Sequence, residues 1–244
     1  EPTLKQLMTA IAPPPGVHFA DLASAPGGCF RIEDTARRAI TLEQLERIAR
    51  HVATRLGGEL EVVKEKGINA TWKQTRDAGE RWLGKRLRGD RFVQQAVSFS
   101  EVNLYECNKY VIGPATAAQC CSMVELMASE EQPPDYFASH FPAESVIEFL
   151  KCLLEHSWAR GLESEEGYHN GEMMQPHPLY LGGRSPRYWV GAHANNQHEL
   201  ASEIVDDLAQ TSFARAMQIA KGTVSVVDGS AGCFERIWCV YELY

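Results

Sequence analysis

Several polar side chains follow directly after short apolar segments, where a ligand could bind at the end of a strand. They are Ser139, His140, Asn195, Asn196 and Asp228. Nucleotide sites in open parallel sheets lie outside the carboxyl ends of the strands, so these residues, with the rest of the stretch 192–197, would lie near one edge of such a sheet. The asparagine amides could bind a ribose or a base there, but asparagine is also a common turn former and helix cap.

Three segments are predicted to form the strands of that sheet. Residues 136–138 and 188–190 are short, apolar and aromatic, which is typical of buried strands. Residues 223–228 are rich in β-branched side chains and apolar on both faces, as expected of a central parallel strand.

The helices between these strands have recognisable starts. Ser145 and Glu148 have the spacing of a capping box, ahead of a broad apolar face that reaches about residue 159. Thr211 begins a second helix that Gly222 ends, and the last residues, from Phe234, return to helical spacing. The alternation of strand and helix implies a parallel sheet with right-handed crossovers.

The first half of the chain is expected to divide into an irregular segment, residues 1–40, and a mainly helical region, residues 41–131. Thr41 and Gln44 form a capping-box pattern at the start of a clear helix. Residues 59–100 combine Lys and Arg with two tryptophans. Such a mixture can bind RNA, but in an acidic chain a solvated helix face with two anchoring rings is the favoured interpretation.

A second domain is predicted over residues 132–244. Before it, residues 101–116 are predicted to form a strand or turn ending at Pro114, and a helix is expected near 117–129. The run Gln132-Pro133-Pro134 breaks regular structure and marks the boundary.

Composition excludes some classes of function. The chain has 244 residues and a net charge of −8, which argues against nonspecific nucleic-acid binding, and no apolar run is long enough to span a bilayer. Seven cysteines, an odd number without a CxxC pair, indicate reduced thiols in the cytoplasm or another reducing compartment, with an organelle and a removed transit peptide left open. No metal site is predicted, because His169 and His177 lack partners at ligand spacing.

Three stretches of the second half are similar to TIR (Toll/interleukin-1 receptor) domains. Residues 137–140 resemble the first TIR strand, residues 212–227 resemble the helix that leads into the third strand, and Ile237-Trp238-Cys239-Val240-Tyr241-Glu242-Leu243 resembles the Trp-Cys-x-x-Glu-Leu motif of the next helix. The likeness covers residues 136–244. The chain also resembles a group of algal and protist proteins with Ser-His-x-x-x-Glu, Ala-Asn-Asn-Gln-His and Arg-Ile-Trp-Cys stretches.

The resemblance implies a possible activity. Enzymatic TIR domains cleave NAD+ between nicotinamide and ribose with a glutamate that corresponds to Glu242, and Trp238 matches a tryptophan four residues before it in the animal enzymes. Departure of nicotinamide develops oxocarbenium character, which a carboxylate stabilises. NAD+ would then be a substrate, and no cofactor is implied. Ser139, His140, Asn195, Asn196 and Asp228 would line the same edge as substrate-binding residues.

Departures from the family pattern leave other functions open. Phe141 and Pro142 stand where the animal enzymes carry arginines, and Asp228 stands where many TIR domains have serine. Many TIR domains are adaptors that assemble without catalysis. A third hypothesis comes from residues 19–28, which resemble the Asp-Leu-x-x-Ala-Pro-Gly-Gly stretch of ribose methyltransferases that bind S-adenosylmethionine.

The expected fold class is therefore α/β, with a parallel flavodoxin-like (TIR-like) sheet flanked by helices and a mainly helical N-terminal region. A full TIR fold needs further strands, so either the chain continues beyond Tyr244 or the N-terminal region completes the sheet. The favoured function is a TIR-like signalling or assembly module with protein partners or self-assembly, as a subunit or scaffold of a larger complex. NAD+ hydrolysis through Glu242 is the alternative.

Overall fold

A four-stranded sheet lies at the centre of the computed structural model, in the order β1-β9-β6-β10. Its strands are β1 (Ile40–Thr41), β9 (Arg187–Trp189), β6 (Tyr136–Ser139) and β10 (Thr223–Ser225). The strands β9, β6 and β10 are parallel, as predicted, and β1 joins β9 antiparallel. The N-terminal region thus adds a strand to the sheet.

The third predicted strand occupies a different place from the expected one. Among the described strands β10 is the last in the order, and Thr223 and Ser225 are exposed. The prediction that segment 223–228 is a central strand was therefore wrong for its described part. The apolar pattern reflects Val226, which is buried just after the strand, rather than neighbours on both sides.

The structure describes residues 18–24, 28–63, 69–75, 79–163, 167–169, 172–174, 180–200 and 207–227. Three predicted site residues, Asp228, Trp238 and Glu242, lie outside the described residues.

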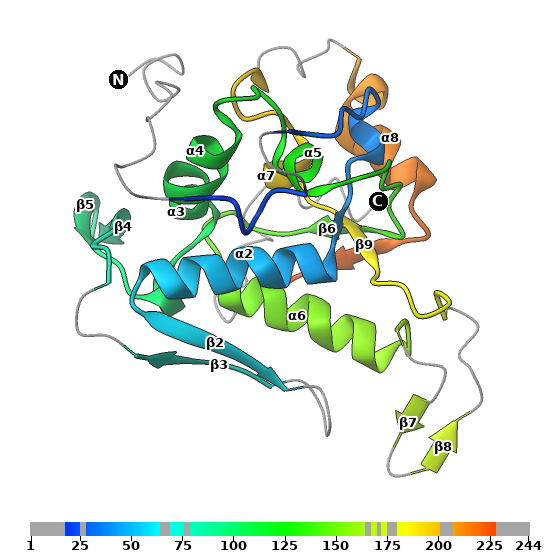
Figure 1. The fold of residues 1–244 in the computed structure, drawn as a ribbon, viewed down its shortest axis with the longest axis horizontal. Coiled ribbons are helices and arrows are strands. Elements are labelled where there is room, and N and C mark those ends of the chain that lie inside the picture. The colour runs from blue at the N-terminus through cyan, green and yellow to red at the C-terminus, as the bar shows by residue number, and fades with distance from the viewer. Residues whose placement is uncertain are drawn as a thin grey trace.

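Two long helices cover one side of the sheet. The helices α2 (Leu42–Arg55) and α6 (Val146–Ala159) contact each other and lie on the side of the sheet opposite α7 (Gly191–Ala194) and α8 (Ser212–Ile219) (Figure 1). The capping box predicted at Thr41 is present, with its hydroxyl accepting from the N–H of Gln44 at 3.1 Å. The capping box predicted at Ser145 was wrong. Helix α6 begins there, but no described group hydrogen-bonds the Ser145 hydroxyl.

The region 41–131 is less helical than predicted. The described strands of this region form two antiparallel pairs, β2 (Gly58–Val63) with β3 (Asn69–Gln74) and β4 (Leu83–Arg88) with β5 (Arg91–Ala96). The two tryptophans of this region do not belong to the predicted solvated helix face but anchor the two hairpins to the rest of the protein. The Trp72 ring stacks on Phe99, and the Trp82 ring stacks on Tyr110. A third hairpin joins β7 (Gly167–His169) to β8 (Glu172–Met174).

Residues 104–116 form a continuous helical segment, where a strand or turn was predicted. It consists of α3 (Leu104–Cys107), a π-helical turn (Asn108–Ile112) and α4 (Gly113–Thr116). Pro114 has no N–H for the carbonyl of Tyr110, and the guanidinium of Arg55 donates to that carbonyl instead. Pro114 therefore widens the helix and does not end it.

The remaining elements are short. They are the 3-10 turns Thr35–Arg37, Phe99–Glu101 and Leu208–Gln210, and helix α5 (Met123–Met127). Of the described helices, none combines the length and the apolar character needed to cross a bilayer.

The predicted boundary at Gln132 lies within one continuous core. Residues of α2 such as Ile48 and Val52 belong to the same buried cluster as Leu150 of α6 and Tyr188 of β9. Gln132 is itself buried, and its amide donates to the carbonyl of Ala39 at 2.6 Å. The N-terminal region and the sheet therefore pack as one unit.

Candidate functional site

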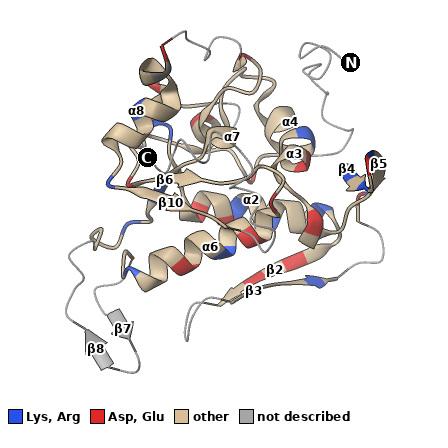
Figure 2. Cartoon of the chain, turned by 180° about the vertical axis from the view of Figure 1, so that it is seen from behind, with Lys and Arg blue, Asp and Glu red and all other residues tan. Residues whose placement is uncertain are grey.

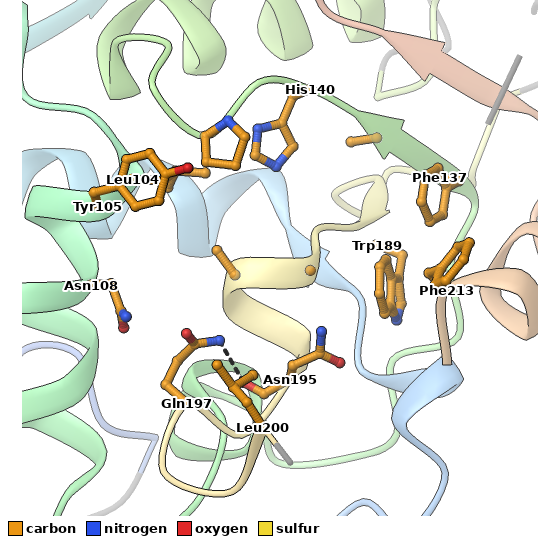
Figure 3. Close-up of a pocket in the computed structure, with 14 residues that line it drawn as sticks. Leu104, Tyr105, Asn108, Phe137, His140, Trp189, Asn195, Gln197, Leu200 and Phe213 are labelled. Carbon is orange, nitrogen blue, oxygen red and sulfur yellow. Dashed lines mark hydrogen bonds between the residues drawn. The ribbon is translucent and has the colours of Figure 1, made fainter. Parts of the chain in front are cut away.

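A pocket of about 600 Å³ opens at the carboxyl ends of β6 and β9. His140 follows β6 directly, and Gly191 and Ala192 follow β9 in the first turn of α7. Leu104 and Tyr105 of α3 line it as well, as does Phe213 of α8 (Figure 3). The pocket thus lies at the edge where parallel sheets commonly bind nucleotides.

One wall of the pocket is aromatic. The rings of Phe137 and Trp189 stack with centroids 5.3 Å apart and an interplanar angle of 15°. The indole N–H of Trp189 donates to the carbonyl of Thr35 at 2.9 Å, which fixes the orientation of the ring. In Figure 3 Phe213 lies beside these two rings, with Tyr105 and Asn108 across the pocket. Phe137 and Trp189 are only 2% and 3% exposed, so a small part of each ring reaches the pocket, where it can contact a planar ring of a ligand.

Three side-chain amides line the pocket, those of Asn108, Asn195 and Gln197. The Asn108 oxygen is buried, and no described group donates a hydrogen bond to it. A buried acceptor without a donor is costly, and Asn108 begins the π-helical turn, a type of irregularity that is frequent at functional sites. Both observations favour a ligand that donates a hydrogen bond here.

In the stretch 195–198, two side chains face the pocket and two bind neighbouring segments of the chain. The Asn195 oxygen accepts from the hydroxyl of Ser212 at 3.3 Å, and the Gln197 amide donates to the Asn195 carbonyl at 3.2 Å. Asn196 is buried, and its amide donates to the carbonyl of Cys120 at 3.0 Å. His198 contacts the Thr116 hydroxyl at 2.8 Å. Asn196 and His198 therefore hold the loop in place while Asn195 and Gln197 face the pocket.

A buried histidine lies behind the pocket. His193 of α7 is 2% exposed, and burial, reinforced by the nearby His140, lowers its pKa to about 3. The His193 ring is therefore neutral at physiological pH. His140 packs its ring on Phe149, with centroids 4.8 Å apart, which orients it at the end of β6.

The pocket is mainly apolar, with a few polar side chains and no charged lining among the described residues. None of its described lining residues is Lys, Arg, Asp or Glu. A phosphate would therefore find no cation there, whereas an aromatic ring, a ribose or an amide would find stacking surfaces and hydrogen-bonding groups. Within the described part of the chain, no group of three or more His, Cys, Asp or Glu could hold a metal ion.

The predicted site residues fall into three groups. His140 and Asn195 line the pocket, whereas Ser139 is buried within the sheet and Asn196 supports the loop. Asp228, Trp238 and Glu242 lie outside the described residues. The sequence interpretation missed Asn108, because it placed residues 101–116 in a strand or turn. The π-helical turn that positions Asn108 depends on Pro114 and on Arg55, far away in sequence.

The described part of the methyltransferase-like stretch, residues 19–24, contains no strand. Among residues 19–24, Leu22 is fully buried, and the Leu22 carbonyl accepts from Arg47 at 2.7 Å. Asp21 contacts the ring of His51 at 2.8 Å. These described residues form a turn that packs on α2.

Comparisons with family models, with curated proteins and with solved structures found no match to this chain. The function must therefore be argued from the site itself.

Proposed function

We propose that this chain is a TIR-like signalling or assembly module that binds the uncharged part of a nucleotide in the pocket at the carboxyl ends of β6 and β9. The observation that carries the proposal is the pocket itself, which combines a stacked aromatic wall with Asn108, whose buried oxygen lacks a donor. Ligand binding at this edge would control the assembly of the module with its partners.

The arrangement of the strands supports a flavodoxin-like interpretation. Along the chain β6 comes first, β9 second and β10 third, so the spatial order β9-β6-β10 corresponds to the 2-1-3 order of flavodoxin-like sheets. In that topology ligands bind outside the carboxyl ends of the strands, at the switch point that here lies between β6 and β10. The pocket lies at the same edge of the sheet, beside this point, at the ends of β6 and β9. The TIR likeness predicts the same order.

The lining chemistry favours a nucleoside or nicotinamide–ribose portion over a phosphate. An aromatic base or nicotinamide ring would stack against the wall formed by Phe137, Trp189 and Phe213. An exocyclic amine, an amide or a ribose hydroxyl would donate to the Asn108 oxygen. The phosphates would extend out of the pocket into solvent, where they need no cationic side chain to balance their charge.

Cleavage of NAD+ is the second candidate, and the likeness of the Trp238–Glu242 motif favours it. The bond between the nicotinamide nitrogen and the ribose would break, nicotinamide would leave, and water would add to the ribose to give ADP-ribose. The described lining offers no carboxylate to stabilise the oxocarbenium-like transition state. Glu242 would have to supply that charge, so this reaction requires the carboxylate of Glu242 to reach the pocket.

A pair of glycine variants tests ligand binding. A Cβ at Gly191 would lie 3.6 Å from the Trp189 ring and 3.7 Å from the Asn195 amide, in ordinary contact, so Gly191→Ala narrows the pocket without a clash. A Cβ at Gly28 would meet nothing within 4 Å, so Gly28→Ala is the matched control. Calorimetric titration with NAD+, adenosine and S-adenosylmethionine should show binding of the first two to wild type and Gly28→Ala. Gly191→Ala should weaken the binding of NAD+ and adenosine about tenfold.

Two results would contradict the proposal. One is that the wild-type protein binds neither NAD+ nor adenosine. The other is equal affinity of Gly191→Ala and wild type, which would place the ligand elsewhere. Preferential binding of S-adenosylmethionine would favour the methyltransferase hypothesis instead.

A further inference from the structure

The hairpin β4–β5 concentrates positive charge in an acidic protein. Residues 81–96 include five Lys or Arg and one Asp, whereas the whole chain has a net charge of −8. The hairpin lies at one extremity of the molecule (Figure 1), and Figure 2 shows its basic residues away from the acidic residues of α2, α6 and β2. Arg86 is held by Glu106 at 2.9 Å, but Lys85, Arg88 and Arg91 are exposed and form no ion pair with a described carboxylate.

The same hairpin exposes apolar side chains. Leu87 and Phe92 are directly opposite each other across the two strands, and they are 59% and 73% exposed. Lys85 and Gln94, the next pair on this face, are exposed as well. One face of the hairpin therefore presents an apolar pair beside cationic and polar groups, with no described residue packed over it.

The outer edge of β5 has unpaired backbone groups. Gly89 has a φ of +58° and starts the two-residue turn, so Arg88 and Arg91 form the first hydrogen-bonded pair. Hydrogen-bonded and non-hydrogen-bonded pairs alternate from there, which directs the N–H and C=O groups of Phe92, Gln94 and Ala96 outward. No backbone hydrogen bond from a described residue outside the hairpin reaches these three. On the other side, β4 contacts α3, so β5 is the accessible edge.

We propose that the β5 edge binds an acidic, extended segment of a partner protein, which adds to the hairpin as a third strand. Its backbone would pair with Phe92, Gln94 and Ala96 in β-augmentation. Its carboxylates would pair with Arg88 and Arg91 on one face of the hairpin, and its alternate apolar side chains would cover Leu87 and Phe92 on the other. A two-stranded hairpin is marginal alone, and a third strand with an apolar face stabilises it.

Charge and geometry disfavour the other occupants. A second copy of this hairpin would bring a second cluster of Lys and Arg to the same edge. A membrane would meet Asp90 first, since this carboxylate occupies the turn. A single-stranded nucleic acid needs stacking platforms for successive bases, and Phe92 is the one aromatic residue on these two strands.

A labelled peptide tests the proposal on the intact protein. The probe is a fluorescein-labelled peptide of alternating glutamate and valine, about ten residues long, measured by fluorescence anisotropy at low and high salt. We expect saturable binding that weakens with salt. The double variant Arg88→Glu/Arg91→Glu should weaken it at least about tenfold. The charge reversal Arg160→Glu, at an exposed arginine beyond the end of α6, is the matched control and should leave peptide binding unchanged.

The edge is tested separately from the charge. Gln94→Pro removes an outward N–H and keeps the ladder between β4 and β5, so it should weaken binding about fivefold. Binding of the alternating lysine–valine peptide, equal affinity for an N-methylated acidic peptide, or retention of binding in Arg88→Glu/Arg91→Glu would overturn the proposal. Tighter binding of uridine oligonucleotides or anionic vesicles, or a dimer that Gln94→Pro abolishes without peptide binding, would overturn it as well.

Discussion

Replacement of Asn108 by leucine should stabilise the protein while weakening its ligand binding. The Asn108 oxygen is buried without a described donor, and an unsatisfied buried polar atom costs about 1–3 kcal/mol. Leucine has a similar size and shape, so Asn108→Leu removes that cost without opening a cavity. The free energy of unfolding should rise by about 1–2 kcal/mol, equivalent to about 2–8 °C in Tm for a chain of this length.

Asn103 provides the control on the same helical segment. Its side-chain oxygen accepts from the N–H groups of Tyr105 at 3.0 Å and Glu106 at 3.2 Å and caps α3. Asn103→Leu should therefore lower the free energy of unfolding by about 1–2 kcal/mol. Denaturant unfolding followed by circular dichroism would measure both variants against wild type. A loss of stability in Asn108→Leu comparable to that in Asn103→Leu would refute the reasoning, because it would mean that the Asn108 oxygen is already satisfied.

Three further predictions follow from the buried charges and the proposed chemistry. Burial lowers the pKa of His193 to about 3 and that of His156 to about 4. Below about pH 6.5 the unfolded chain therefore binds more protons than the folded protein, and the free energy of unfolding should fall by about 1.4 kcal/mol per pH unit for each histidine. His156→Phe should remove about half of that pH dependence in urea unfolding. Asp135 is bound by Arg184 at 2.6 Å across the amino end of β6, and Asp135→Asn should cost about 2 kcal/mol in urea unfolding at pH 7, where an unchanged midpoint would show the ion pair to be dispensable. If the protein cleaves NAD+, Glu242→Gln should abolish nicotinamide release measured by chromatography and leave NAD+ binding intact, whereas equal release by wild type and variant would exclude Glu242 as the catalytic residue.

Asp135 also predicts acid sensitivity. Burial alone would raise its pKa, but the hydrogen bonds from Arg184 and from the backbone N–H of Arg187 outweigh burial and lower it. A lowered pKa of the folded state contributes stability above the ordinary pKa of the carboxyl group, and this contribution is lost as the pH falls. The Asp135 carboxylate, the buried His193 and the partly buried His156 therefore change stability in the same direction.

The parts of the fold that could be predicted from the sequence are those set by local patterns. The helix after Thr41 has its capping box and apolar face within the same few residues, and α2 begins where predicted. The strands after residues 135 and 186 were recognisable because buried parallel strands are short and continuously apolar. Strand-end reasoning predicted that His140 and Asn195 lie near one edge of the sheet, and both line the pocket there.

The rest depends on contacts between distant segments. The carbonyl left unbonded by Pro114 is satisfied by Arg55, and only the tertiary structure shows that a helix therefore continues through Asn108. Asn195 and Asn196 are adjacent asparagines, yet Cys120 holds the second one away from the pocket. The sequence shows which residues are suited to strand ends, but it does not show which neighbour will hold each of them.

The central claim is that the pocket between β6, β9 and α3 binds the uncharged part of a nucleotide. A crystal structure of the protein with bound NAD+ tests it most directly. The account predicts a planar ring against Trp189 and Phe137, with a hydrogen bond donated to the Asn108 oxygen and the phosphates outside the pocket. An NAD+ molecule bound elsewhere, or phosphates seated against the Trp189 wall, would contradict it.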